Sequence, residues 1–199
     1  MKEYTIVKKG ETLDWSRVPS LSMETQEWSK ETDISAIAKI CYDAENLYVY
    51  LEAKEKHIRA VEKMPAGSPC QDSCLEFFFR PDIEDERYMN FEFSPTTCYY
   101  VGIGRTVDNL VRLVPDGWDP FDAKPVYTED GWYITYRIPL SFIRIYFPSV
   151  SFTSGKEIRA NCYKCGDCTE VPHYMAWEPV PYVNSAFHQP KYFGLMRFA

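Results

Sequence analysis

Apolar and polar positions alternate along two neighbouring segments in the middle of the chain. In residues 88–94, Phe91 and Phe93 alternate with polar side chains, a period of two that is typical of a half-buried β-strand. In residues 74–80 a strand would put Leu75, Phe77 and Phe79 on one face, and Glu76, Phe78 and Arg80 on the other. The acidic link of residues 82–87 is short, so the two segments are expected to form an antiparallel hairpin.

The register of this hairpin decides which polar side chains meet. A turn centred near Glu84 places Glu76 opposite Glu92 and Phe78 opposite Asn90. Directly opposed carboxylates repel each other, so we expect a positive group or a hydroxyl-rich molecule beside them. A slip of one residue would exchange the two faces.

Strand patterns recur along the rest of the chain. They fall in residues 4–7, 36–42, 47–53, 98–104, 126–128, 132–138, 156–163 and 193–198. Residues 47–51 are apolar or aromatic on both faces, which favours a central strand. Helical turns are expected only near residues 57–63 and 139–143. About nine or ten strands with frequent turns predict an all-β fold, an immunoglobulin-like antiparallel β-sandwich with long loops, in one domain spanning residues 1–199.

Composition limits the classes of binding partner and the cellular compartment that we expect. The 199 residues carry a net charge of −7 without a Lys/Arg-rich patch, which argues against nucleic acid or an anionic membrane as partner. No apolar run approaches the ~20 residues that span a bilayer. The sequence as written lacks a signal-peptide core, which predicts a cytoplasmic protein; a trimmed chain would instead be periplasmic or secreted. The seven cysteines are expected to be reduced.

Two constellations suggest chemistry other than binding. The spacing Cys162-x2-Cys165-x2-Cys168 with His173 suggests zinc, but a second Cys-x2-Cys pair is missing and Cys162 should point inward, so we expect no metal site. Glu76 and Glu92 could form a glycosidase pair, since facing residues of a hairpin lie near the separation of about 5 Å that retaining enzymes use. A small glycoside hydrolase is therefore an alternative.

A polar and aromatic segment follows late in the chain. Residues 161–179 contain Lys164, Asp167, His173 and Trp177, and His188 comes soon after. Indole faces pack against the C–H side of a sugar ring, while charged and amide groups bind its hydroxyls. The alternative is a well-tied loop in which the imidazoles bond backbone groups. Trp118, in a turn-rich loop, either plugs the packing or joins the site.

The order of several motifs resembles family 9 carbohydrate-binding modules, and in particular the family 9-like branch found as stand-alone proteins in gut Bacteroidetes. The resemblance rests on Asp72 to Phe78, Asn90 to Phe93, Asn161 to Asp167, Pro172-His173-Tyr174 with Trp177, and Phe187 to Pro190 with Tyr192-Phe193-Gly194. It implies a DOMON-like β-sandwich that binds sugar without catalysis, and a glycoside hydrolase as a possible functional partner. It also implies that calcium is possible, since structural calcium is seen in the founding modules.

The resemblance also assigns individual residues. Glu76 matches the acid of the Asp-Ser-x-x-Glu strand, Asn90 the amide of its partner strand, and Trp177 the second of two Trp that clamp a sugar. Cys70 stands where the founding modules have the first Trp, and Glu92 where they have Arg. The clamp is therefore incomplete unless Trp118, Trp15 or Trp28 supplies a second ring.

We thus predict a non-catalytic carbohydrate-binding protein with no required cofactor. A shallow groove over the 72–94 hairpin would be lined by Glu76, Asn90, Glu92, Lys164, Asp167, His173, Trp177 and Trp118. The incomplete clamp leaves a further alternative, a structural or partner-binding module whose sugar site has decayed.

Overall fold

The structure is a computed structural model that describes residues 1–117, 119–182 and 187–199. The strands are β1 (Glu3–Lys8), β2 (Leu21–Thr25), β3 (Ser35–Tyr42), β4 (Asn46–Lys54), β5 (Cys74–Arg80), β6 (Tyr88–Phe93), β7 (Tyr99–Gly104), β8 (Val111–Arg112), β9 (Lys124–Tyr127), β10 (Gly131–Pro139), β11 (Glu157–Cys165), β12 (Tyr174–Ala176) and β13 (Gly194–Phe198). The α-helix is α1 (Leu140–Tyr146), and short 3-10 turns are η1 (Trp15–Arg17), η2 (Pro69–Gln71), η3 (Val107–Asn109) and η4 (Pro190–Tyr192).

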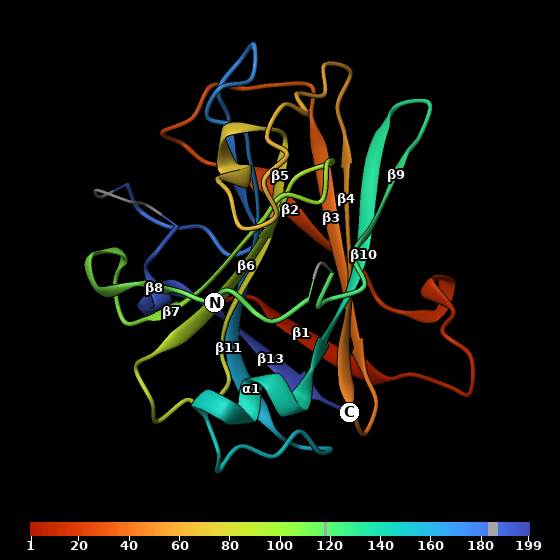
Figure 1. Ribbon diagram of the computed structural model, residues 1–199, viewed down its shortest axis with the longest axis vertical. Helices are drawn as coiled ribbons and strands as arrows, with labels where there is room; N and C mark the ends of the chain where they lie inside the picture. The colour runs from red at the N-terminus through yellow and green to blue at the C-terminus, as the bar shows by residue number, and fades with distance from the viewer. Residues whose placement is uncertain (118, 183–186) are drawn as a thin grey trace.

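The strands form two layers that are joined along one side. The first layer has the antiparallel order β8-β7-β6-β5-β11, and the second has the antiparallel order β2-β3-β4-β10-β9 (Figure 1). β12 and β13 both pair with β11; β12 then pairs with β2, and β13 with β1. The predicted all-β sandwich is confirmed, with one difference: β1 runs parallel to both β13 and β3. Among the described residues, no helix is long and apolar enough to cross a membrane.

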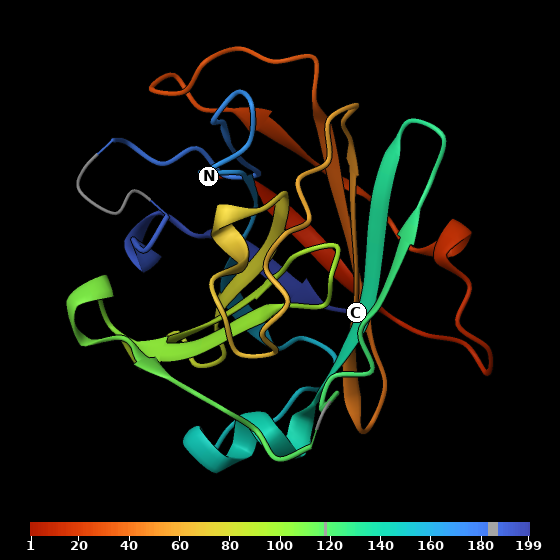
Figure 2. The same cartoon turned by 45° about the horizontal axis from the view of Figure 1, so that its top comes forward.

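The main core lies between the two layers. Phe77 and Phe79 of β5 and Phe91 of β6 are fully buried there. They belong to one cluster with Val49 of β4 and Ile134 of β10, which are strands of the facing layer (Figure 2). Each fully buried side chain of this size contributes about 1.5–3 kcal/mol relative to an exposed one. The prediction of a central strand at residues 47–51 is confirmed, because β4 pairs with β3 on one side and with β10 on the other.

The outer face of the first layer is covered as well. A second apolar cluster on this face joins Phe78 of β5, Tyr88 of β6 and Tyr163 of β11 to Val180 and Phe187 of the chain after β12. Strands β5 and β6 are therefore buried on both sides, which explains the nearly continuous apolar run in β5.

The register predicted for the central hairpin is confirmed. Glu76 pairs with Glu92 and Phe78 with Asn90. The predicted helical turn near residue 140 is the start of α1, whereas residues 57–63 form no helix. The three strands that the pattern missed are β2, β8 and β12, which have five, two and three residues. Such short segments lack enough alternating positions to be recognised.

Trp177 lies in the main core, so the prediction that it lines the groove is wrong. Its exposed fraction is 4%, and its ring meets that of Tyr4 edge-on at 6.4 Å between centroids. A Cβ added at Gly194 would come within 2.5 Å of the indole, so the ring packs directly on the backbone of β13. Side chains alternate along residues 174–177. Met175 and Trp177 point into the main core, and Tyr174 and Ala176 point to the outer face of the first layer.

Trp177→Ala is therefore expected to lower the free energy of unfolding by about 3–5 kcal/mol, because it leaves a cavity in the core. Urea denaturation followed by fluorescence or circular dichroism measures this change. Trp15→Ala is the matched control, since Trp15 is partly exposed and its ring packs on Tyr50 of the second layer. A Trp177→Ala protein as stable as the wild type would contradict the core placement.

Candidate functional site

A pocket of about 630 Å³ opens on the outer face of the first layer. Its lining residues, which we call the acidic pocket, are Trp28, Cys70, Glu76, Glu92, Val107, Cys165, Asp167, Tyr174, Tyr182, Phe187 and His188. The volume falls in the range of about 300–1,000 Å³ that small-molecule sites occupy. The pocket therefore brings together three of the predicted site residues, Glu76, Glu92 and Asp167.

The floor of the acidic pocket comes from three adjacent strands. Glu76 of β5 lies directly opposite Glu92 of β6, and Cys165 of β11 lies beside them. The Cys165 thiol donates to Glu76 Oε1 at 3.0 Å, and Asn90 Nδ2 donates to Glu92 Oε1 at 2.6 Å. Asn90 is completely buried and outside the pocket lining, so it supports Glu92.

The two facing carboxyls hold protons more tightly than ordinary glutamates. Burial, together with the charge of Asp167, raises the pKa of Glu76 to about 7. Burial and the charge of Glu76 raise the pKa of Glu92 well above its ordinary value. Among the described lining residues there is no Lys or Arg, so the expected positive neighbour is not supplied by the pocket wall. The carboxyl pair retains a proton near neutrality instead.

An aromatic wall rises on one side of the floor. The Trp28 ring lies 4.9 Å from that of Tyr174, 5.6 Å from Tyr182 and 5.8 Å from Phe187, centroid to centroid. Trp28 Nε1 donates to the Val180 carbonyl at 3.2 Å, which fixes the indole in place. The sequence offered Trp28 only as one of three rings that could complete a clamp, because nothing local ties residue 28 to the hairpin.

The lining also contains Val107 and His188. The Tyr88 hydroxyl and His188 Nδ1 are 2.7 Å apart in a hydrogen bond. Burial lowers the pKa of His188 to about 4, so the imidazole is neutral at physiological pH. Asp167 forms part of the exposed rim; its amide donates to the Cys70 carbonyl at 2.9 Å, which ties the rim to η2.

Three side chains whose atoms could bind a metal ion lie close together at the same floor. The ligating atoms of Cys74, Glu76 and Cys165 are all within 4.8 Å of one another. Two thiols and one carboxylate suit a soft ion such as zinc, whereas calcium takes oxygen ligands, so this group does not fit calcium. The three thiols of Cys162-x2-Cys165-x2-Cys168 do not come together at one site, because Cys162 is in the main core and Cys168 is exposed.

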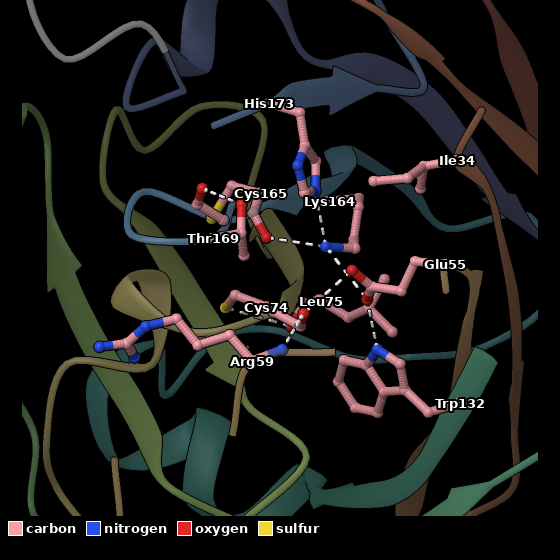
Figure 3. A network of polar contacts seen from close by, with 12 residues as sticks. Ile34, Glu55, Arg59, Cys74, Leu75, Trp132, Lys164, Cys165, Thr169 and His173 are labelled. Carbon is pink, nitrogen blue, oxygen red and sulfur yellow. Dashed lines mark hydrogen bonds and ion pairs between the residues drawn. The ribbon is translucent and has the colours of Figure 1, made fainter. Parts of the chain in front are cut away.

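Lys164 and His173 do not reach the acidic pocket, which corrects the sequence prediction. Successive residues of a strand point to opposite faces, so Lys164 points inward where Cys165 points outward. Lys164 Nζ lies 3.3 Å from Glu55 Oε1 and 2.8 Å from His173 Nε2, and it donates to the Cys165 carbonyl at 2.9 Å (Figure 3).

This buried network has further partners. Glu55 accepts from Trp132 Nε1 at 2.7 Å and from Ser73 Oγ at 2.9 Å. Asp72 beside Ser73 pairs with Arg59 and accepts from the amide of Val61 at 2.8 Å. The Asp72-Ser73 motif is thus structural, since it ties the loop before β5 to the interior.

The last predicted residue, Trp118, lies outside the described residues. The binding roles of Glu76, Glu92 and Asp167 remain predictions that the pocket geometry allows. Trp28, one of the rings that could complete the clamp, lines the pocket, whereas Trp177 does not.

Removing one partner of the buried ion pair should be costly. Glu55→Ala leaves the Lys164 ammonium buried without its carboxylate, and we expect the free energy of unfolding to fall by about 3–5 kcal/mol. The double variant Glu55→Gln with Lys164→Met removes both charges and should recover much of that loss. Urea denaturation at neutral pH measures both; equal losses in the two variants would contradict the pairing.

The raised pKa of Glu76 predicts a pH-dependent stability. The unfolded chain loses this proton near its ordinary pKa of about 4.5 and the folded chain only near 7, so stability declines as pH rises between these values. Glu76→Gln should make the pH-dependent fall in the free energy of unfolding smaller, by on the order of 3 kcal/mol. Denaturation at several pH values tests this, with the exposed Glu84→Gln in the same hairpin as control. An unchanged pH profile in Glu76→Gln would contradict the assignment.

Solved structures with the same fold have been described as carbohydrate-binding. A candidate carbohydrate-binding protein of Bacteroides uniformis superposes with a TM-score of 0.85 at 22% identity, covering 100% of this chain and 99% of that one. A family 9 carbohydrate-binding module of Caldicellulosiruptor kristjanssonii in complex with glucose gives 0.70 at 15% identity, covering 100% and 96%. The complex of such a module from the same organism with cellotriose gives 0.69 at 15%, covering 99% and 93%.

No curated protein matches the sequence of the chain. The family model described as carbohydrate-binding family 9 matches residues 8–198, which is nearly the whole sequence. The chain therefore belongs to carbohydrate-binding family 9, a family of non-catalytic carbohydrate-binding modules.

Proposed function

We propose that the protein binds carbohydrate in the acidic pocket and does not turn it over. The observation that carries this proposal is the placement of the facing carboxyls of Glu76 and Glu92 beneath a wall built around Trp28. A pyranose presents an apolar C–H face and a rim of hydroxyl groups. The indole wall suits the first, and the carboxyls of the floor suit the second.

Family membership supports the same ligand class. The modules from Caldicellulosiruptor kristjanssonii are in complex with glucose and with cellotriose, and the fold they share with this chain covers nearly its full length. Those complexes make glucose and short β-glucans reasonable first probes. The pocket of about 630 Å³ is large enough for a small ligand of this kind.

The arrangement of the two acids argues against a hydrolase. A glycosidase places its carboxyl groups on either side of the bond that breaks. Glu76 and Glu92 instead come from neighbouring strands and project from the same face of one sheet, so a sugar lies above both.

Two further expectations accompany this proposal. A glycoside hydrolase would be the functional partner that makes use of a bound glycan. Calcium is not needed for the acidic pocket as proposed, because carboxyl groups and rings alone contact the sugar.

Trp28→Ala is expected to weaken sugar binding at least about tenfold, because the sugar loses its stacking surface. A glycan array selects the ligand, and calorimetry with that ligand and with cellotriose gives the affinities. Trp15→Ala is the control, as Trp15 packs on Tyr50 of the second layer, away from the pocket.

Equal affinities for Trp28→Ala and the wild type would reject this pocket as the sugar site. A wild-type protein that is folded but binds nothing on the array would favour the alternative of a decayed site.

A further inference from the structure

The charge of the acidic pocket goes beyond what a neutral sugar requires. Its described lining contains three carboxyl side chains, those of Glu76, Glu92 and Asp167, and no Lys or Arg. From outside the lining, the Lys164 ammonium acts on Glu76, but it is already paired with Glu55 on the inner face. The positive group that acts on Glu92 is Arg112. Its guanidinium is already engaged, since it stacks on Tyr100 at 4.5 Å and donates to the Ala66 carbonyl at 2.6 Å. The pocket thus offers net negative charge to its ligand.

The facing pair of acids holds a proton that a cation of the ligand can replace. Glu76 and Glu92 are 3% and 6% exposed and lie directly opposite each other. Like charges this close and this well buried are stable only with a proton or a cation between them. Hydroxyl groups can donate hydrogen bonds to these carboxyls, but they do not offset the charge. A ligand ammonium would do both, because it brings three donors and one positive charge.

The aromatic wall favours the same group. The rings of Trp28, Tyr174 and Tyr182 lie close together and line the same pocket as the acids. Aromatic faces attract cations as well as the C–H face of a sugar. A sugar ring that carries an amine can therefore stack on the wall and direct its charge to the floor. A sugar carboxylate at the same place would meet Asp167 and the charge that remains on the carboxyl pair, and no Lys or Arg of the described lining would pair with it.

We propose that the acidic pocket selects glycans that carry a free, protonated amine, and that it discriminates against uronic acids and N-acetylated amines. This inference rests on the proposed function, since it specifies the ligand of the same pocket. The other titratable or charged groups around the floor are Cys70, Cys165, Asp167, Tyr174 and His188 of the lining. From outside the lining, Cys74, Tyr88, Tyr100, Lys164 and Arg112 interact with its carboxyls.

The test compares three trisaccharides with one backbone. Cellotriose carries hydroxyls at C2, the β-1,4-linked glucosamine trimer carries amines there, and the N-acetylglucosamine trimer carries neutral amides. Calorimetry uses the full chain, dialysed against a chelator, at low salt and about pH 6, where the amines of the trimer are protonated. We expect the amine trimer to bind at least about tenfold more tightly than cellotriose, with an advantage that shrinks as salt rises.

A second readout separates charge recognition from shape. If the ammonium replaces a proton held by the carboxyl pair, the binding enthalpy of the amine trimer will depend on the ionisation enthalpy of the buffer. Cellotriose, which is uncharged, should show no such dependence.

Glu92→Gln tests the carboxyl itself. Glutamine keeps the size and most hydrogen bonds of the side chain but removes its charge, so the ratio of the two affinities should fall about tenfold. Glu129→Gln, at the exposed tip between β9 and β10, is the matched control and should leave the ratio unchanged. Asp167→Asn on the exposed rim serves as the second variant if Glu92→Gln fails to fold.

The outcomes distinguish this inference from the proposed function. Binding of cellotriose as tight as or tighter than that of the amine trimer overturns the amine preference and leaves carbohydrate binding standing. Preference for a uronate on a glycan array does the same. A folded protein that binds none of the three trisaccharides and nothing on the array overturns both.

Discussion

The structure depends on a hairpin, β5–β6, that is buried on both faces. Its inner face supplies Phe77, Phe79 and Phe91 to the core between the layers. Its outer face supplies Phe78 and Tyr88 to the second cluster, and next to them the acids of the pocket floor. Because packing on both sides holds these strands, the carboxyls of Glu76 and Glu92 are held in place before any ligand arrives. A pocket on such a rigid support loses little conformational freedom on binding.

Buried charge is handled differently on the two faces of the first layer. On the inner face, the Lys164 ammonium has Glu55 and His173 as partners, and Glu55 has Trp132 and Ser73 in turn. That network is satisfied within the protein and serves stability. On the outer face, the carboxyls of Glu76 and Glu92 have no basic lining residue in the described chain, and burial raises their pKa values. Uncompensated groups that open into a pocket point to a ligand, while compensated groups sealed in a core do not.

Three of the eight predicted site residues line the pocket, and the successes and failures have different physical reasons. The alternating pattern around Phe91 and Phe93 predicts the hairpin and its facing acids, because a strand's period is two and the link is short. Lys164 and Trp177 looked like surface binding residues, since the sequence lists them among polar and aromatic neighbours. Whether these side chains point inward or outward depends on which residues of β11 and β12 face the core. Pairing with strands far away in the sequence decides this, as for Cys165 of β11, which lies opposite Cys74 of β5.

The sequence by itself determined the sandwich class, the central strand β4 and the hairpin with its register, because these follow from local periodicity and short connections. Only the tertiary structure decided that Trp28 lies at the pocket, that Trp177 seals the core on Gly194, and that Lys164 pairs inward with Glu55. These outcomes depend on contacts between segments far apart in the chain. Local pattern states which two faces a strand has, but the packing of distant segments decides which of them remains open to a ligand.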